Sequence, residues 1–157
     1  MGKLYGSLDN RLEENKNFLG RAEIKEGDDL TEYLWSDRRA YFVTRVENQK
    51  HIFVKRYETC ADHEKEGGMG HQDWLYFKTA KEHQEYINKC VDKGLLPEFC
   101  KHPIEEVKEN GESELVFRYG HWYWVQTYWY DKKLDKPKYH KANISFGVRD
   151  YYYDWSF

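Results

Sequence analysis

Residues 38–58 read RRAYFVTRVENQKHIFVKRYE, and their pattern predicts a β-hairpin. The runs 38–47 and 51–58 are rich in β-branched and aromatic residues, which is typical of strands. Residues 48–50, Asn-Gln-Lys, join the two runs, and this length suits a tight loop in which asparagine can adopt a left-handed conformation. Stretches of similar composition occur at 31–35, 73–79, 113–119, 121–130 and 139–148.

Two helices are expected beside these strands. The segment SLDNRLEENKNFLG spaces its leucines at helical intervals, which predicts a short N-terminal helix from about Leu8 to Phe18. Thr79, followed three places later by Glu82, forms a capping box that predicts a central helix over about 80–93. The chain contains no alternation of strand, helix and parallel strand.

These elements predict an α+β fold, mainly an antiparallel twisted sheet with an N-terminal helix and one central helix, in a single domain over residues 1–157. The lysine-rich segment 131–138, DKKLDKPK, is expected to connect two strands. The segment 59–72 contains three glycines and many charges, so we expect it to be an exposed, mobile loop.

The composition concentrates the apolar surface in rings. The chain has 14 Tyr, 8 Phe and 6 Trp, and its net charge is −3. Residues 59–114 carry 7 basic and 13 acidic groups, whereas residues 115–157 carry 7 basic and 4 acidic groups. Three cysteines without a regular spacing and the lack of a long apolar run predict a cytoplasmic protein that does not enter a membrane.

The segment 120–133, GHWYWVQTYWYDKK, has six aromatic residues between positions 121 and 130. In a strand these side chains alternate between two faces, and neither face is purely polar. If the C-terminal segment RDYYYDWSF covers one face, both faces are structural; otherwise an aromatic and lysine patch is exposed for binding. The candidate partner-binding residues here are Trp122, Trp124, Tyr128, Tyr130, Lys132 and Lys133.

Two charged groups are further candidates for partner binding. Arg38 and Arg39 follow a turn, where adjacent guanidinium groups could bind a phosphate or a carboxylate of a partner. Asp62, Glu64 and Glu66 lie in the acidic part of the chain, where carboxylates can take the place of phosphates in a basic groove.

The sequence indicates no catalytic site, metal or cofactor. Cys60 and His63 have the spacing of a zinc-ligand pair, with His71 nearby and Cys100 and His102 downstream. The second pair, however, is separated by only one residue and lies among prolines, unlike the pairs of a strong zinc signature. Gly67–Gly70 lack the lysine of a phosphate-binding loop and the strand and helix that flank one. No nucleophile stands in a recognisable catalytic context. We therefore expect a non-enzymatic protein.

Three segments carry a resemblance: LYGSLDNRLEENKNF near the start, TEYLWSDRRAYFVTRVENQKHIFVKRYE in the middle and KANISFGVRDYYYDWSF at the end. Together they resemble a group of small phage and prophage accessory proteins from Firmicutes. The resemblance implies a protein made inside an infected bacterial cell, and proteins of this class are often inhibitors of host defence, including anti-CRISPR proteins. The expected function is inhibition of a host defence system, such as a CRISPR effector nuclease, by protein-protein occlusion.

A second function stays open at this point. Aromatic side chains at 120–130 could stack nucleobases while Arg38, Arg39 or the lysines at 132–138 bind phosphate. The protein would then bind a nucleotide or single-stranded nucleic acid, and could sequester a signalling nucleotide.

Overall fold

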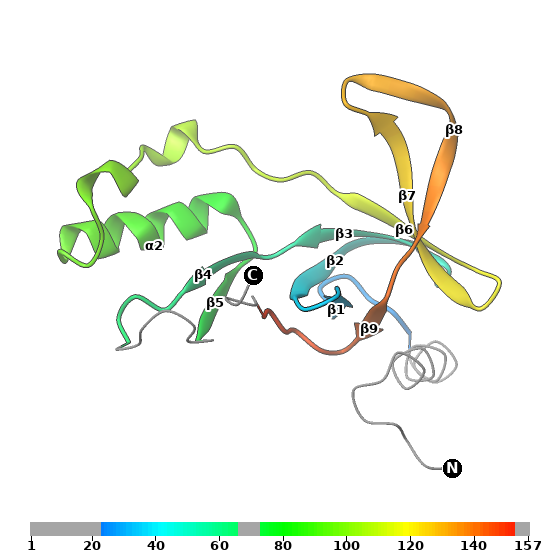
Figure 1. Ribbon diagram of the computed structural model, residues 1–157, viewed down its shortest axis with the longest axis horizontal. Helices are drawn as coiled ribbons and strands as arrows, with labels where there is room; N and C mark the ends of the chain where they lie inside the picture. The colour runs from blue at the N-terminus through cyan, green and yellow to red at the C-terminus, as the bar shows by residue number, and fades with distance from the viewer. Residues whose placement is uncertain (1–22, 66–72, 153–157) are drawn as a thin grey trace, which may run out of the picture.

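The computed structural model describes residues 23–65 and 73–152 (Figure 1). The strands are β1 (Asp29–Tyr33), β2 (Arg38–Asn48), β3 (His51–Arg56), β4 (Glu58–Ala61), β5 (Trp74–Phe77), β6 (Ser113–Arg118), β7 (His121–Trp129), β8 (Lys132–Lys141) and β9 (Ile144–Phe146). The helical elements are α2 (Ala80–Asp92) and two short 3-10 turns, η1 (Glu98–Cys100) and η2 (Ile104–Glu106). The predicted N-terminal helix, about Leu8 to Phe18, lies outside the described residues.

Seven of the described strands form one antiparallel sheet in the order β8-β7-β6-β3-β2-β1-β9. Its two edge strands are neighbours in the chain, because only Ala142 and Asn143 separate β8 from β9. At this corner the Ala142 N–H donates to the Trp122 carbonyl oxygen at 2.9 Å, and the Tyr33 N–H donates to the Asn143 carbonyl oxygen at 2.8 Å. The sheet therefore curls so that its two edge strands meet at this corner, and we call the curled part the barrel.

The predicted antiparallel sheet and central helix are confirmed. The first hairpin also forms, but its turn is residues 49–50, because Asn48 belongs to β2, where it lies opposite His51 of β3 and has no left-handed conformation. The predicted strand 139–148 is instead divided at Ala142 and Asn143. The residues before this point belong to β8 and pair with β7, whereas the strand after it is β9, which pairs with β1. Its two parts therefore belong to opposite edges of the sheet.

Alternate residues of the strands point into the barrel and form its core. Trp122 is the largest fully buried side chain, and its ring lies 5.4 Å, centroid to centroid, from the rings of both Phe117 and Phe146. The remaining aliphatic core residues are Ile24, Leu30, Val43, Ile52, Val54, Leu115, Ala142 and Ile144. A ring of this size removes about 150–250 Å² from water, so Trp122 alone contributes a large share of the buried apolar area.

The chain between β3 and β6 forms a separate lobe, which comprises β4, β5, α2, η1 and η2 (Figure 1). Helix α2 begins as its capping box predicts, because the Thr79 hydroxyl accepts the Glu82 N–H at 3.1 Å. The Glu109 carboxylate accepts the N–H groups of Ala80 at 2.6 Å and Lys81 at 3.1 Å, and a negative charge here is stabilised by the helix dipole. The N-terminal turn of α2 is thus fixed from two sides.

The loop expected at 59–72 is partly a strand. Residues 58–61 form β4 and pair with β5, and Cys60 is buried there. The β4–β5 pair packs against α2, and the polar sequence around β4 did not indicate this tertiary contact. Residues 66–72 lie outside the described part of the chain.

The connection expected at 131–138 was wrong, because residues 132–138 belong to β8. Strands β7 and β8 extend past the barrel as a two-stranded ribbon (Figure 1), and residues 130–131 make its turn. Tyr128 lies opposite Lys133, and Trp129 lies opposite Lys132. The backbone pairing of such a ribbon needs no buried side chains, so β8 has no apolar alternation by which its sequence could be recognised.

Candidate binding surfaces

The end of the ribbon is the most prominent exposed aromatic surface near the predicted site residues. We define the ribbon tip as Tyr128, Trp129, Tyr130, Lys132 and Lys133. Tyr128 is 55% exposed, Trp129 58% and Tyr130 85%. Residues directly opposite each other in an antiparallel pair project to the same face, so Lys132 and Lys133 each lie beside an aromatic side chain. A surface hollow of about 530 Å³ adjoins Trp129 and these lysines.

Tyr130 adopts a backbone conformation that does not suit its side chain. Its φ is 52°, in the left-handed region that glycine and asparagine occupy at lower cost. Its ring makes a T-shaped contact with Trp129 at 5.1 Å but is otherwise turned to solvent. The turn itself therefore gives no structural reason for a tyrosine at this position.

Trp122 does not belong to a partner surface, which corrects the prediction for this residue. It is only 2% exposed, and the barrel encloses its ring. Within the described residues its indole N–H has no hydrogen-bond acceptor. The alternation along β7 placed the residue on a face, but the curl of the sheet decided that this face is the core.

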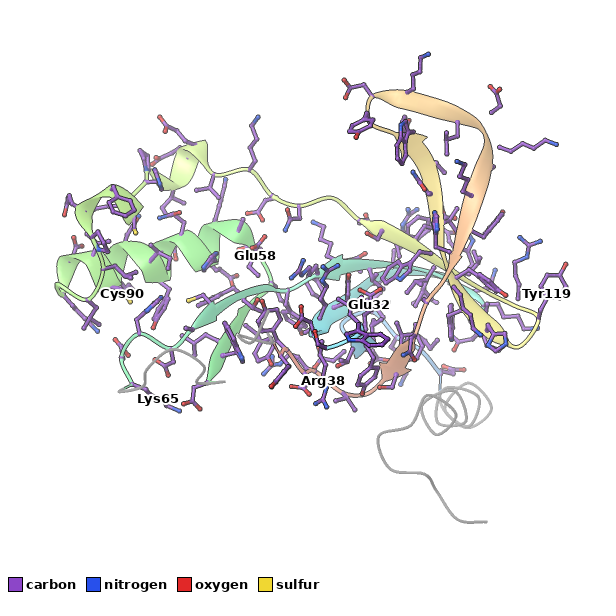
Figure 2. All side chains as sticks on the ribbon, in the orientation of Figure 1. Glu32, Arg38, Glu58, Lys65, Cys90 and Tyr119 are labelled. Carbon is purple, nitrogen blue, oxygen red and sulfur yellow. The ribbon has the colours of Figure 1, made fainter. Side chains whose placement is uncertain are left out.

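Trp124 lies at one end of the barrel, in a group that we call the barrel mouth: Glu32, Arg39, Tyr41 and Trp124. The Trp124 indole N–H donates to Glu32 Oε2 at 2.8 Å, and the Tyr41 hydroxyl donates to Glu32 Oε1 at 3.1 Å. Arg39 Nη1 lies 4.0 Å from the same carboxylate. These residues border a hollow of about 530 Å³ (Figure 2 labels Glu32).

The electrostatics of the barrel mouth favour a fixed network over a reactive group. Burial raises the pKa of the Tyr41 hydroxyl to about 12, and the charge of Glu32 adds to this effect. Tyr41 is therefore a neutral donor at ordinary pH. Each Glu32 oxygen accepts one ring donor, so the carboxylate satisfies two buried polar groups that would otherwise be costly.

Arg38 is engaged by the C-terminal segment. Its guanidinium Nη1 lies 2.5 Å from Asp150 Oδ2, and its backbone exchanges hydrogen bonds of 3.0 and 3.2 Å with Tyr152. The ring of Tyr151 packs against Trp74 of β5 at 4.5 Å. The described part of the C-terminal segment thus contacts β2 and β5, and the exposed face of the ribbon tip lies elsewhere.

The predicted acidic candidates lie in the lobe. Asp62 Oδ1 accepts the Glu64 backbone N–H at 3.1 Å and stabilises a turn. Glu64 forms an ion pair of 2.5 Å with Lys93, which raises the pKa of that lysine. Glu66 lies outside the described residues. The exposed carboxylates of the lobe include Glu82, Glu85, Glu98, Glu105 and Glu106.

The structure brings no metal site together among the residues that it describes. Cys60 is buried, and burial, followed by the nearby Cys90, raises the pKa of its thiol to about 12. His63 stacks on the ring of Tyr86, and His71 lies outside the described residues. A thiol with so high a pKa is a poor metal ligand and a poor nucleophile.

Several exposed side chains were missed by the sequence patterns. Trp35, in the turn between β1 and β2, is 95% exposed, and Tyr119, in the turn between β6 and β7, is 86% exposed. Both are the last residues of the predicted strands 31–35 and 113–119, but β1 ends at Tyr33 and β6 ends at Arg118, so both residues lie in turns instead. Arg118 and Tyr139 are also exposed, and only the pairing of β6, β7 and β8 brings them near Tyr119.

Within the described ranges, no helix has both the length and the apolar surface needed to cross a bilayer. Comparisons with protein-family models, with curated proteins and with solved structures found no match for this chain.

Proposed function

We propose that this chain is a non-enzymatic binding protein that inhibits a host defence system in the cytoplasm of an infected bacterial cell. Its target would be a protein that handles nucleic acid, such as a CRISPR effector nuclease, and inhibition would occur by occlusion of the target surface. The ribbon tip is the observation that carries the proposal. It projects from the barrel and exposes tryptophan and tyrosine, the residue types that dominate the binding energy of protein interfaces.

The charge distribution supports a target with a basic groove. The solvent-facing carboxylates of the lobe lie in the acidic segment 59–114, whereas the ribbon tip is basic. Complementary potentials accelerate association and exclude wrong partners. The lobe would occupy the groove in place of nucleic-acid phosphates, and the ribbon tip would anchor the complex.

The test is a phage infection assay in a Firmicutes host that carries an active CRISPR system. Expression of the chain should restore plaque formation by a targeted phage, and a tagged copy should retain the effector nuclease in a pull-down. Trp129→Ala should abolish both effects. Trp35→Ala is the matched control, since it also removes an exposed tryptophan, and it should leave both effects intact. Failure to protect the phage in any defence background would contradict the proposal.

A second candidate function has a specific observation in its favour. The register places Lys132 and Lys133 directly beside Trp129 and Tyr128, which combines a stacking ring with a phosphate-binding charge. The ribbon tip would then bind single-stranded nucleic acid. Titration with a single-stranded oligonucleotide should quench tryptophan fluorescence in the wild-type protein and fail to do so in Trp129→Ala. Absence of quenching in low salt would exclude this candidate.

A further inference from the structure

A second aromatic hollow lies at the other end of β7 from the ribbon tip. It is lined by Arg118, Tyr119, Tyr123 and Tyr139 and has a volume of about 240 Å³. Figure 2 labels Tyr119, which stands at the turn between β6 and β7. We call this group the tyrosine hollow.

The strand register places the hollow on the outer face of the barrel. Tyr123 lies opposite Val116 on one side and opposite Lys141 on the other, so these three side chains share a face. Arg118 is two residues from Val116, and Tyr139 is two residues from Lys141, so both project to that face as well. Three neighbouring strands thus supply the hollow with rings and with Arg118, and Lys141 lies on the same face beside Tyr123.

The guanidinium of Arg118 is held by rings. Its Cζ lies 4.7 Å from the centroid of Tyr139 and 5.7 Å from that of Tyr119. No ion pair with Arg118 or Lys141 occurs among the described residues, and both side chains are exposed. The hollow therefore presents positive charge beside its aromatic wall, with no carboxylate of the described chain to neutralise it.

The backbone conformation of the turn indicates that the Tyr119 side chain has a role other than forming the turn. Tyr119 has φ 53° and Gly120 has φ 79°, so both residues are in the left-handed region. Two-residue hairpin turns of this conformation favour Asn-Gly, because a tyrosine there is strained. The ring is 86% exposed, so burial does not compensate for the strain. Such strain at an exposed aromatic side chain is characteristic of binding sites.

We propose that the tyrosine hollow binds a free mononucleotide. The base stacks on the tyrosine rings, and the phosphate group pairs with Arg118 and Lys141. Guanidinium groups bind phosphate bidentately, and aromatic side chains stack any base, so the two parts of the hollow match the two parts of this ligand. A volume of about 240 Å³ is below the range usual for drug-sized ligands, so the hollow would hold the base while the ribose and phosphate lie at its rim.

The test is calorimetric titration of the purified full-length protein with AMP and GMP, compared with adenosine alone. We expect saturable binding of at least one mononucleotide and at least tenfold weaker binding of adenosine, because the phosphate contact is lost. Adenosine binding as tight as AMP binding would overturn the assignment of Arg118. No binding of either mononucleotide at millimolar concentration would overturn the proposal.

Tyr119→Asn separates binding from folding. The variant should lose at least tenfold in mononucleotide affinity while its Tm stays equal or rises, because asparagine relieves the strained turn. Arg118→Gln should also weaken AMP binding, but it should leave the weak binding of adenosine unchanged. Unaltered AMP affinity in Tyr119→Asn would overturn the proposal, since the ligand would then lie elsewhere.

This inference is independent of the ribbon tip, and the same variants keep the two apart. Trp129→Ala should bind AMP like the wild type, and Tyr119→Asn should still protect phage. A single-stranded oligonucleotide that binds the hollow when AMP does not would overturn the assignment to a free nucleotide.

Discussion

The two halves of β7 have similar aromatic content but differ in the burial of their aromatic side chains. In the first half, Trp122 and Trp124 face the barrel, where one is enclosed and the other donates to Glu32. In the second half, Trp129 lies on the ribbon and is 58% exposed. The difference arises from the neighbouring strands, since the first half pairs with β6 and β8 while the second pairs with β8 alone. Aromatic content therefore indicates burial only when a second layer or a closed sheet is present.

The two halves of β7 should also contribute differently to the stability of the fold and to the binding of a partner. Side chains in the first half should control the free energy of unfolding, and those in the second half should control binding. Substitutions along this one strand can break or confirm that division.

Trp122→Ala should give the largest effect. It removes the largest core side chain, so the free energy of unfolding should fall by about 3–5 kcal/mol, which is a large part of the stability of a small protein. Urea denaturation followed by circular dichroism measures this change. Trp122→Phe is the control, because it keeps a ring and removes a donor without an acceptor in the described residues. Equal losses in the two variants would contradict the assignment of Trp122 to the core.

Trp124→Phe should have a smaller effect. The ring packing against Tyr41 remains, but Glu32 Oε2 loses its donor at 2.8 Å, which should cost about 1–3 kcal/mol. The measurement is again chemical denaturation. A double-mutant cycle with Glu32→Gln should reveal coupling between the two positions, and purely additive effects would show that the hydrogen bond is unimportant.

Alkaline pH should destabilise the barrel through Tyr41. The pKa of this tyrosine rises from 10.0 in the unfolded chain to about 12 in the folded protein, so its contribution is complete below pH 10 and is lost as the pH rises through 12. In this window the free energy of unfolding should fall by about 1.4 kcal/mol per pH unit from this residue. Tyr57, whose pKa burial also raises to about 12, titrates in the same range. Tyr41→Phe should therefore reduce the slope of stability against pH without abolishing it.

Tyr130→Asn should have a small effect on stability, with the opposite sign. Relief of the left-handed strain should raise the free energy of unfolding by up to about 1 kcal/mol, while affinity for the partner falls. Thermal denaturation and the pull-down measure the two quantities. Trp129→Ala, by comparison, should change stability by less than about 0.5 kcal/mol. A clear loss of stability in either variant would mean that the ribbon tip packs against the rest of the chain.

Several site predictions depended on knowing which strands are neighbours. The alternation correctly separated residues 121–126 into two faces, but a register shift follows Gln126, Tyr130 lies in the turn, and the alternation could not say which positions the barrel encloses. Arg38 stood out as an exposed turn residue, yet its ion pair with Asp150 joins positions 112 residues apart. The tyrosine hollow was missed for the same reason, because Arg118 and Tyr139 are adjacent only across β7.

The sequence by itself determined the local elements: the hairpin of β2 and β3, the capped helix α2 and the antiparallel character of the sheet. These features depend on residue propensity, turn chemistry and periodicity, which act over a few positions. Only the tertiary structure decided that the chain bends at Ala142 and Asn143, so that β8 and β9 close the barrel from opposite edges. That closure enclosed Trp122 and left the ribbon tip exposed, because burial depends on which distant strands meet, and no local pattern encodes that.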